Sequence, residues 1–145
     1  MDRLDFISYL RCYCISNKIY FAAGESDYVN AIADQNLFKN YDLIMCADLT
    51  LTPNFSESGV SSVTYNGYIS LGRKREQTTF SSIDETFIQK YDNRLKDLVS
   101  MLVNFFNNLS CMEAATINSC TMDYLLNRTD VNIDFVSASV SITFE

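Results

Sequence analysis

The apolar residues of segment 83–109 place the strongest constraint on the fold. From Ile88 onward they recur at alternating steps of three and four, the spacing of an amphipathic α-helix. Ser82 and Glu85 form a capping box at its start. At 1.5 Å per residue, the predicted helix is about 40 Å long. The recurring positions are Ile88, Tyr91, Leu95, Leu98, Leu102, Phe105 and Leu109.

The second half of this helix, Leu98–Leu109, contains no charged residue. At about 100° per residue its apolar side chains cover an arc of about 200°, whereas a helix that faces one core needs little more than about 100°. We therefore expect a sheet to cover Leu95, Leu98, Leu102, Phe105 and Leu109. The remaining apolar positions are expected to meet the first helix or a neighbouring copy. These candidate self-association residues are Val99, Val103 and Phe106.

Two segments before the helix alternate between apolar and polar residues, which is the pattern of half-buried strands. The first is Tyr41–Thr52 and the second is Val60–Arg73, and the polar segment Pro53–Gly59 is predicted to be the loop between them. The dipeptide Asn66–Gly67 leaves a tight hairpin turn as an alternative. Unbroken alternation across it favours one long strand with a glycine bulge. A long antiparallel pair is expected in either case.

Shorter signals complete the layout. A helix is predicted over Asp2–Ser16, a brief strand over Lys18–Ala22 and a small helix over Ser26–Gln35. After the long helix, one strand runs from Ala115 to near Tyr124 and is followed by a connection. The last strand runs from Val131 to Phe144, with a bulge at Phe135–Val136 that would keep both of its apolar sets on one face. The chain is thus predicted to be a single α+β domain over residues 1–145. It would have an antiparallel sheet with a long hairpin and helices packed on one face.

The residue inventory argues against the common kinds of catalysis. The chain has no histidine, and its four glycines stand apart from one another. This excludes histidine-based triads and the glycine loops that bind phosphates or dinucleotides. The five cysteines lack the spacing of a metal site. We therefore expect a protein that is not an enzyme and that binds no cofactor and no metal.

Net charge and hydropathy further restrict the functions and locations expected of the chain. The net charge of −7 disfavours tight binding to nucleic acid, because an acidic surface repels phosphates. Met1–Asp5 carries two acids and does not resemble a signal peptide. The apolar run Leu98–Phe106 is about half of the roughly 20 residues that cross a bilayer. The expectation is a protein that is not secreted and has no transmembrane segment.

A contact with a different protein is predicted at two places on the hairpin. One is its polar tip, because a long hairpin can extend beyond the core that supports it. The other is the only basic run of the chain, which closes the second strand. The candidate partner-contact residues are Phe55, Arg73, Lys74 and Arg75.

Three stretches of the chain resemble the tail-terminator and neck proteins of tailed bacteriophages in layout and rhythm. They are the strand Tyr41–Pro53, the helix Leu95–Leu109 and the ending Asn127–Phe144, a polar turn followed by an alternating strand. The resemblance implies a virion subunit, assembled in the host cytoplasm, that forms a cyclic ring in the neck or tail. It further implies docking on portal, connector or tail proteins, passage of DNA through the channel without specific binding, and no catalytic residues.

An alternative hypothesis assigns the chain to a different class of protein. A cone-shaped domain, similar to the nuclear-transport-factor-like fold, would hold a small ligand in an apolar pocket between a long helix and a curved sheet. Its lining would be aromatic, and a scaffold domain of another kind is a third possibility. The candidate lining residues are Tyr65, Phe87, Tyr91 and Phe135.

Overall fold

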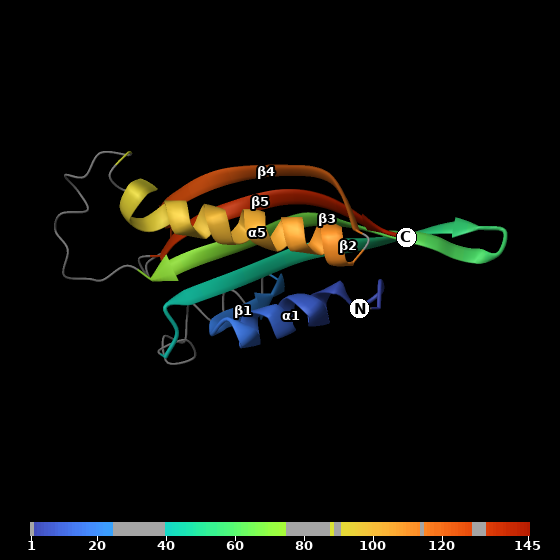
Figure 1. The fold of residues 1–145 in the computed structure, drawn as a ribbon, viewed down its shortest axis with the longest axis horizontal. Coiled ribbons are helices and arrows are strands. Elements are labelled where there is room, and N and C mark those ends of the chain that lie inside the picture. The colour runs from blue at the N-terminus through green and yellow to red at the C-terminus, as the bar shows by residue number, and fades with distance from the viewer. Residues whose placement is uncertain (1, 25–39, 75–87, 89–90, 114, 129–132) are drawn as a thin grey trace.

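The structure is a computed structural model that describes residues 2–24, 40–74, 88, 91–113, 115–128 and 133–145. The described part contains two α-helices, one π-helical turn and a five-stranded sheet (Figure 1). The strand order across the sheet is β1-β2-β3-β5-β4. The elements are α1 (Phe6–Ser16), β1 (Ile19–Ala23), β2 (Leu43–Ser56), β3 (Gly59–Lys74), η1 (Tyr91–Leu95), α5 (Lys96–Met112), β4 (Ala115–Arg128) and β5 (Ile133–Phe144).

The α+β class agrees with the prediction, but the sheet is mixed, so the expectation of a purely antiparallel sheet was wrong. Strands β2, β3, β5 and β4 pair antiparallel, whereas β1 lies parallel to β2. The segment 24–42 between β1 and β2 is far longer than a hairpin turn, and a connection of this length permits parallel pairing. Sequence alternation does not encode strand direction.

The β2–β3 hairpin is longer than predicted. Segment 53–59 was expected to be a loop, but β2 continues to Ser56 and only Glu57 and Ser58 form the turn. Gly59 follows with φ 113°, a conformation that favours glycine. Pro53 is accommodated because no described strand lies beside β2 at that position, and an edge strand tolerates the missing N–H.

Gly67 lies within one continuous strand, which confirms the long-strand reading over a turn at Asn66–Gly67. The predicted bulge at this glycine was wrong, because the register runs through the Leu49–Gly67 pair without a shift. Gly67 has φ 145°, and a Cβ atom there would lie 2.0 Å from the Asp48 carbonyl oxygen. The glycine therefore permits a close approach of β2 and β3.

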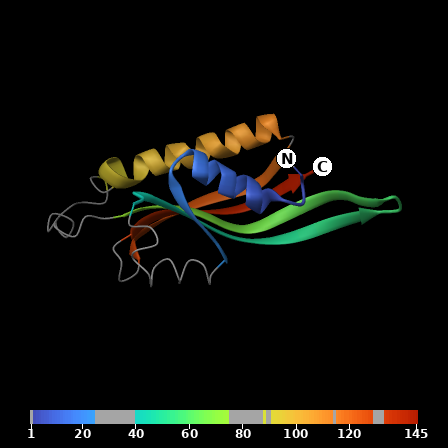
Figure 2. The same cartoon turned by 90° about the horizontal axis from the view of Figure 1, so that it is seen from below.

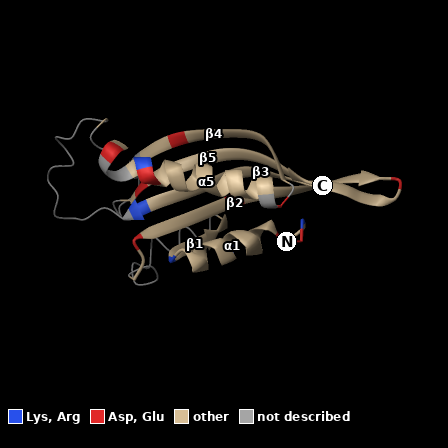
Figure 3. Cartoon of the chain, viewed as in Figure 1, with Lys and Arg blue, Asp and Glu red and all other residues tan. Residues whose placement is uncertain are grey.

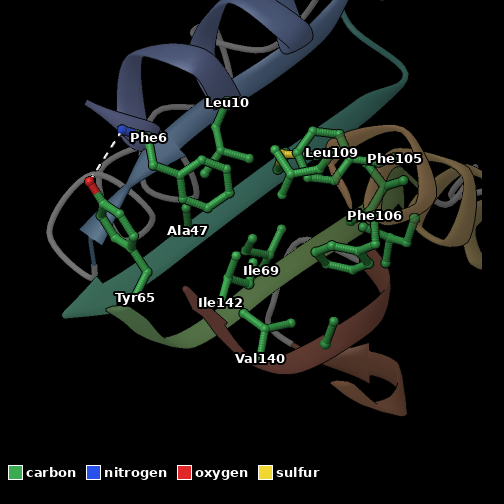
Figure 4. Close-up of a cluster of buried hydrophobic side chains, with 14 of the residues drawn as sticks. Phe6, Leu10, Ala47, Tyr65, Ile69, Phe105, Phe106, Leu109, Val140 and Ile142 are labelled. Atoms are coloured by element: carbon green, nitrogen blue, oxygen red, sulfur yellow. Dashed lines mark hydrogen bonds between the residues drawn. The ribbon is translucent and has the colours of Figure 1, made fainter. Parts of the chain in front are cut away.

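Both described helices lie on the same side of the sheet (Figure 2). Phe6 and Leu10 of α1 and the buried residues of α5 belong to one cluster with one face of the strands (Figure 4). The two helices also meet each other, since the Tyr13 and Phe105 ring centroids are 4.8 Å apart. Helix α5 ends at Met112, three residues beyond the prediction. The predicted capping box and the small helix Ser26–Gln35 lie outside the described residues.

The closing strand differs from its prediction in an informative way. Strand β5 pairs with β3 without a register shift, so the bulge at Phe135–Val136 was wrong. Val136 faces the helices, while Ile133 and Phe135 face the other side and pack with Ile44 in a second, smaller cluster. The alternation of apolar residues therefore shifts by one position at Phe135–Val136 because the first residues of β5 are buried on both faces of the sheet. The irregular pairing lies in β4 instead, which continues to Arg128 where a connection was expected.

Candidate interaction surfaces

The distal part of the hairpin, residues 48–62, extends past the strands on either side of it (Figure 1). We call it the hairpin arm. Strand β1 pairs with β2 only up to Ala47, and β5 pairs with β3 only from Val63. Phe55 near the tip is 74% exposed and Leu51 is 46% exposed. The arm thus carries apolar side chains that the described part of the chain leaves in solvent.

The arm is fixed to the body by the N-terminal segment. The Arg3 guanidinium donates hydrogen bonds to the carbonyl oxygens of Val60 at 2.7 Å and Ser61 at 3.0 Å. The Tyr65 hydroxyl donates to the Arg3 carbonyl at 2.9 Å and accepts the Phe6 N–H at 3.4 Å. Burial raises the pKa of Tyr65, so the hydroxyl keeps the proton that it donates. Sequence reasoning missed Arg3, because nothing in the local pattern points to a partner so far along the chain.

Near its tip the arm is also stiffened by its own polar side chains. The pairs Asn54–Ser62 and Phe55–Val60 leave Ser61 as an extra residue on β3, which is the geometry of a β-bulge. The Ser61 hydroxyl donates to the Asn54 carbonyl at 3.1 Å, and the Asn54 amide donates to the Ser62 hydroxyl at 2.9 Å. These bonds hold Phe55 on an ordered hairpin.

The three candidate self-association residues on α5 have different surroundings. Phe106 is only 5% exposed and belongs to the core cluster of the single chain. Val99 is half-buried against that cluster, and Val103 is 41% exposed. The large apolar arc of the helix is covered mainly within the chain, by the sheet and by the tyrosines of α1. Of the three candidates, Val103 and part of Val99 remain accessible for a contact with another molecule.

Arg73, the first residue of the basic run at the end of β3, contacts another part of the chain. The Arg73 guanidinium forms a two-pronged ion pair with the Asp97 carboxylate on α5. Across the sheet, Arg73 is in register with Asp134, which is 1% exposed. Charges of both signs gather at this end of the structure, as Figure 3 shows. Arg73 therefore links helix α5 to the sheet. Nothing is described of the Lys74 side chain, and Arg75 lies outside the described residues.

The face of the sheet opposite the helices carries many hydroxyl groups in addition to the smaller apolar cluster of Ile44, Ile133 and Phe135. The Ser70 and Ser137 hydroxyls lie 2.8 Å apart and those of Thr64 and Thr143 lie 3.0 Å apart. The Asn118 amide donates to the Thr143 hydroxyl at 2.8 Å. In the three cross-strand rows that start at Asp48, Thr50 and Thr52 of β2, Asp48 is the only charged residue. These rows offer hydrogen-bonding groups but no cation that could retain a phosphate.

The cysteines are free thiols of two kinds. Cys12, Cys111 and Cys120 are exposed. Burial raises the pKa of both Cys14 and Cys46 to about 12, which keeps these thiols protonated and unreactive at neutral pH. Among the described residues, no group of three or more potential ligands could hold a metal ion.

The aromatic residues proposed to line a pocket do not converge in the described part of the chain. Tyr65 packs against the rings of Phe6 and Phe144 in the core. Tyr91 contacts Tyr124, while Phe135 lies on the opposite side of the sheet. Phe87 is outside the described residues. Large side chains fill the space between α5 and the sheet where the ligand would have to lie (Figure 4).

Comparisons with known protein families, with curated proteins and with solved structures found no match for this chain. Within the described ranges, no helix has both the length and the apolar character needed to cross a membrane.

Proposed function

We propose that the chain is a structural subunit of a tailed-phage virion, which forms a ring in the head–tail neck or tail-completion region and docks on portal, connector or tail proteins. The single observation that carries the proposal is the hairpin arm. It extends beyond the paired sheet, is anchored by Arg3 and holds Phe55 at 74% exposure. An ordered arm that presents an exposed aromatic side chain beyond the sheet suits insertion into a neighbouring protein, because aromatic anchors commonly carry much of the binding energy of an interface.

Two further observations fit this role. The hydroxyl-lined sheet face has no cation in the three rows described above, and the chain has an overall charge of −7. DNA could pass such a surface without adhering, because retention on a protein depends mainly on Lys and Arg contacts with phosphates. The order of elements, with a long hairpin followed by a long helix and two closing strands, also agrees with the layout that suggested the family.

The first experiment measures assembly directly. We expect native mass spectrometry to give a closed oligomer and negative-stain electron microscopy to show rings with a central channel. Duplex DNA added at physiological salt should not shift the mobility of the rings in a gel. A monomer at high concentration that takes up small apolar ligands would contradict the proposal and favour the ligand-binding alternative.

A matched pair on α5 tests whether the helix takes part in self-association. Phe106→Asp should unfold the protein, because it places a charge in the core of the single chain. Val103→Asp should leave the circular dichroism spectrum and melting temperature nearly unchanged, because Val103 is 41% exposed. If Val103 lies between copies, the same substitution should shift the oligomer toward monomer. A Val103→Asp variant of unchanged oligomeric mass would remove this helix face from the interface.

A further inference from the structure

Strand β4 forms the longest open edge of the described sheet. It pairs only with β5, so its outer edge has no neighbouring strand in the described ranges, and it borders the sheet at the top of Figure 1. At the opposite border, β1 is only five residues long. Very short edge strands are one way in which proteins limit unwanted pairing. The main-chain N–H and C=O groups along β4 are therefore the ones best suited to pairing with another strand.

The middle of β4 is regular and lacks the residues that usually protect an edge. Its pairing with β5 is irregular after Ile117 and after Leu125, and residues 119–125 between these points pair without interruption. Natural edge strands are commonly protected by Lys, by Pro or by inward-pointing charge. Residues 119–125 contain no Lys, Arg or Pro and only one acid, Asp123. They thus form an unprotected edge that is bounded at both ends by irregular pairing.

The helix side of this edge is apolar and partly open to solvent. Cys120 is exposed, Met122 is half-buried and Tyr124 is 40% exposed. On α5, Phe105 contacts α1, and Val103 lies about 160° further around the helix at about 100° per residue. Val103, which is 41% exposed, therefore faces away from α1 and toward the β4 side of the helix. Helix and strand together present one apolar strip along this border.

An antiparallel contact between two β4 strands is compatible with a two-fold axis normal to the sheet. Such an axis keeps the helices of both copies on the same side, so apolar side chains of one strand meet apolar side chains of the other. With Met122 on the axis, all of residues 119–125 pair, and Thr121 of each copy lies opposite Asp123 of the other. A hydroxyl group then faces the one carboxylate of the segment. An axis at residue 123 would leave part of the segment unpaired and place two carboxylates directly opposite each other, which is unfavourable.

We propose that two copies of this chain pair edge to edge through β4, with residues 119–125 antiparallel to the same residues of the second copy and Met122 on the two-fold axis. The partner is a second copy because the edge is complementary to itself in strand direction, in the side that its apolar residues occupy and in the pairing of its one acid. Main-chain hydrogen bonds would join the two sheets into one. The inference goes beyond the proposed ring, since a two-fold axis can pair free copies or join two rings back to back.

The native Cys120 supplies the matched control for a cross-linking test. In the proposed register the two Cys120 residues of a pair are about 14 Å apart, at about 3.4 Å per residue along the strand. A disulfide spans at most about 7 Å between Cα atoms. The two residues at position 122 lie directly opposite each other, at about 4.5–5.5 Å. Moving the exposed thiol from position 120 to position 122 should therefore switch cross-linking on.

The experiment uses a Cys12→Ser, Cys111→Ser parent, in which Cys120 is the only exposed cysteine and burial protects the other two. After mild oxidation the parent should run as a monomer on a non-reducing gel. Adding Cys120→Ser and Met122→Cys should convert most of the protein to a covalent dimer. As a second variant, Tyr124→Cys in the parent should also give a dimer, because residues 120 and 124 of the two copies lie opposite each other. Circular dichroism melts establish that each variant is folded.

Dimers from both cysteine variants but not from the parent are the result that supports the contact. Dimers of the parent would place the axis elsewhere and overturn the proposed register. Folded variants that give no covalent dimer would refute the β4 contact, and an oligomeric native mass in that case would leave the proposed ring in place. A monomer or an odd number of copies in native mass spectrometry of the unmodified protein would exclude a two-fold contact. A native mass of two copies, with the expected cross-links, would support the contact and contradict the ring.

Discussion

The base of the β2–β3 hairpin, residues 43–47 and 63–74, and its arm show how one sequence pattern serves two purposes. In the base, Met45, Ile69 and Leu71 are at most 1% exposed, because neighbouring strands and two helices surround them. In the arm the same alternation continues, yet Leu51 and Phe55 remain 46% and 74% exposed. Alternation therefore establishes strands in both parts, but only the neighbouring elements decide which part becomes core. Within the arm, Leu49 and Val60 still pack against the core, whereas Leu51 and Phe55 do not.

The largest contrast is expected between matched truncations in the two parts. Ile69→Ala should lower the free energy of unfolding by about 2–4 kcal/mol, because it leaves a cavity in the core. Leu51→Ala should change it by less than about 0.5 kcal/mol in the monomer, because the side chain is already in solvent. Urea titration followed by circular dichroism measures both. An equal decrease in the free energy of unfolding for both variants would show that Leu51 packs in the core and would contradict the difference between base and arm.

The junction between base and arm can be tested through two glycines. Gly67→Ala should cost about 1–3 kcal/mol or shift the strand register, because φ is 145° and the new Cβ would meet the Asp48 carbonyl. Gly59→Ala is the control at the tip, where φ is 113° but no atom lies within 4 Å of the new Cβ. It should cost about 1 kcal/mol or less, from backbone strain alone. Thermal melts of both variants give the difference, and a Gly67→Ala protein as stable as Gly59→Ala would contradict the close approach of the strands.

These glycines also illustrate what sequence could and could not predict. The spacing of apolar residues located the hairpin, the long helix and the closing strands. Burial of one face makes apolar residues recur every two residues in a strand and about every 3.6 residues in a helix. The spacing could not show that β1 lies parallel to β2, or that Phe135 faces away from Val136, because both depend on which element lies next to the strand. The prediction of a loop over residues 53–59 was wrong for a related reason, because polar residues are compatible with a strand pair that lies outside the core.

The candidate contacts follow the same logic. Val103 and Phe106 were both expected to meet the first helix or a neighbouring copy, but Val103 is exposed and Phe106 is buried in the core of the chain. The arc alone could not reveal that Tyr9 and Tyr13 of α1 would cover the adjacent Phe105. The sequence pattern placed Arg73 at the end of a strand and gave no sign that it would pair with Asp97 of α5. Long-range partners of single side chains leave no local pattern.

A smaller contrast concerns the thiols of the body. Cys46 in the base and Cys14 on α1 have their pKa raised from 9.0 to about 12 by burial, so the folded protein retains protons that the unfolded chain releases. Their contribution to stability is complete below pH 9 and declines as pH rises from 9 toward 12. Cys46→Ala should therefore make stability less dependent on pH in that window.

At pH 8, a thiol reagent should label Cys12, Cys111 and Cys120 in the native protein and all five cysteines after denaturation. Rapid native labelling of five thiols would contradict the burial.

The smallest effect on stability is expected at the tip, and it sharpens the comparison most. Phe55→Ala should leave the free energy of unfolding within about 0.5 kcal/mol of the original, because the ring is 74% exposed. If the ring inserts into a pocket of a neighbouring neck or tail protein, its loss should weaken docking by about 2 kcal/mol or more, as for other aromatic anchors at interfaces. Binding of purified candidate neighbours by calorimetry measures this. Glu57→Gln, in the adjoining turn, is the control that changes charge without removing apolar area. If Phe55→Ala and the original protein bind every portal, connector and tail candidate equally well, the tip of the arm takes no part in docking. The function of the arm would then lie along its sides, between copies of the chain.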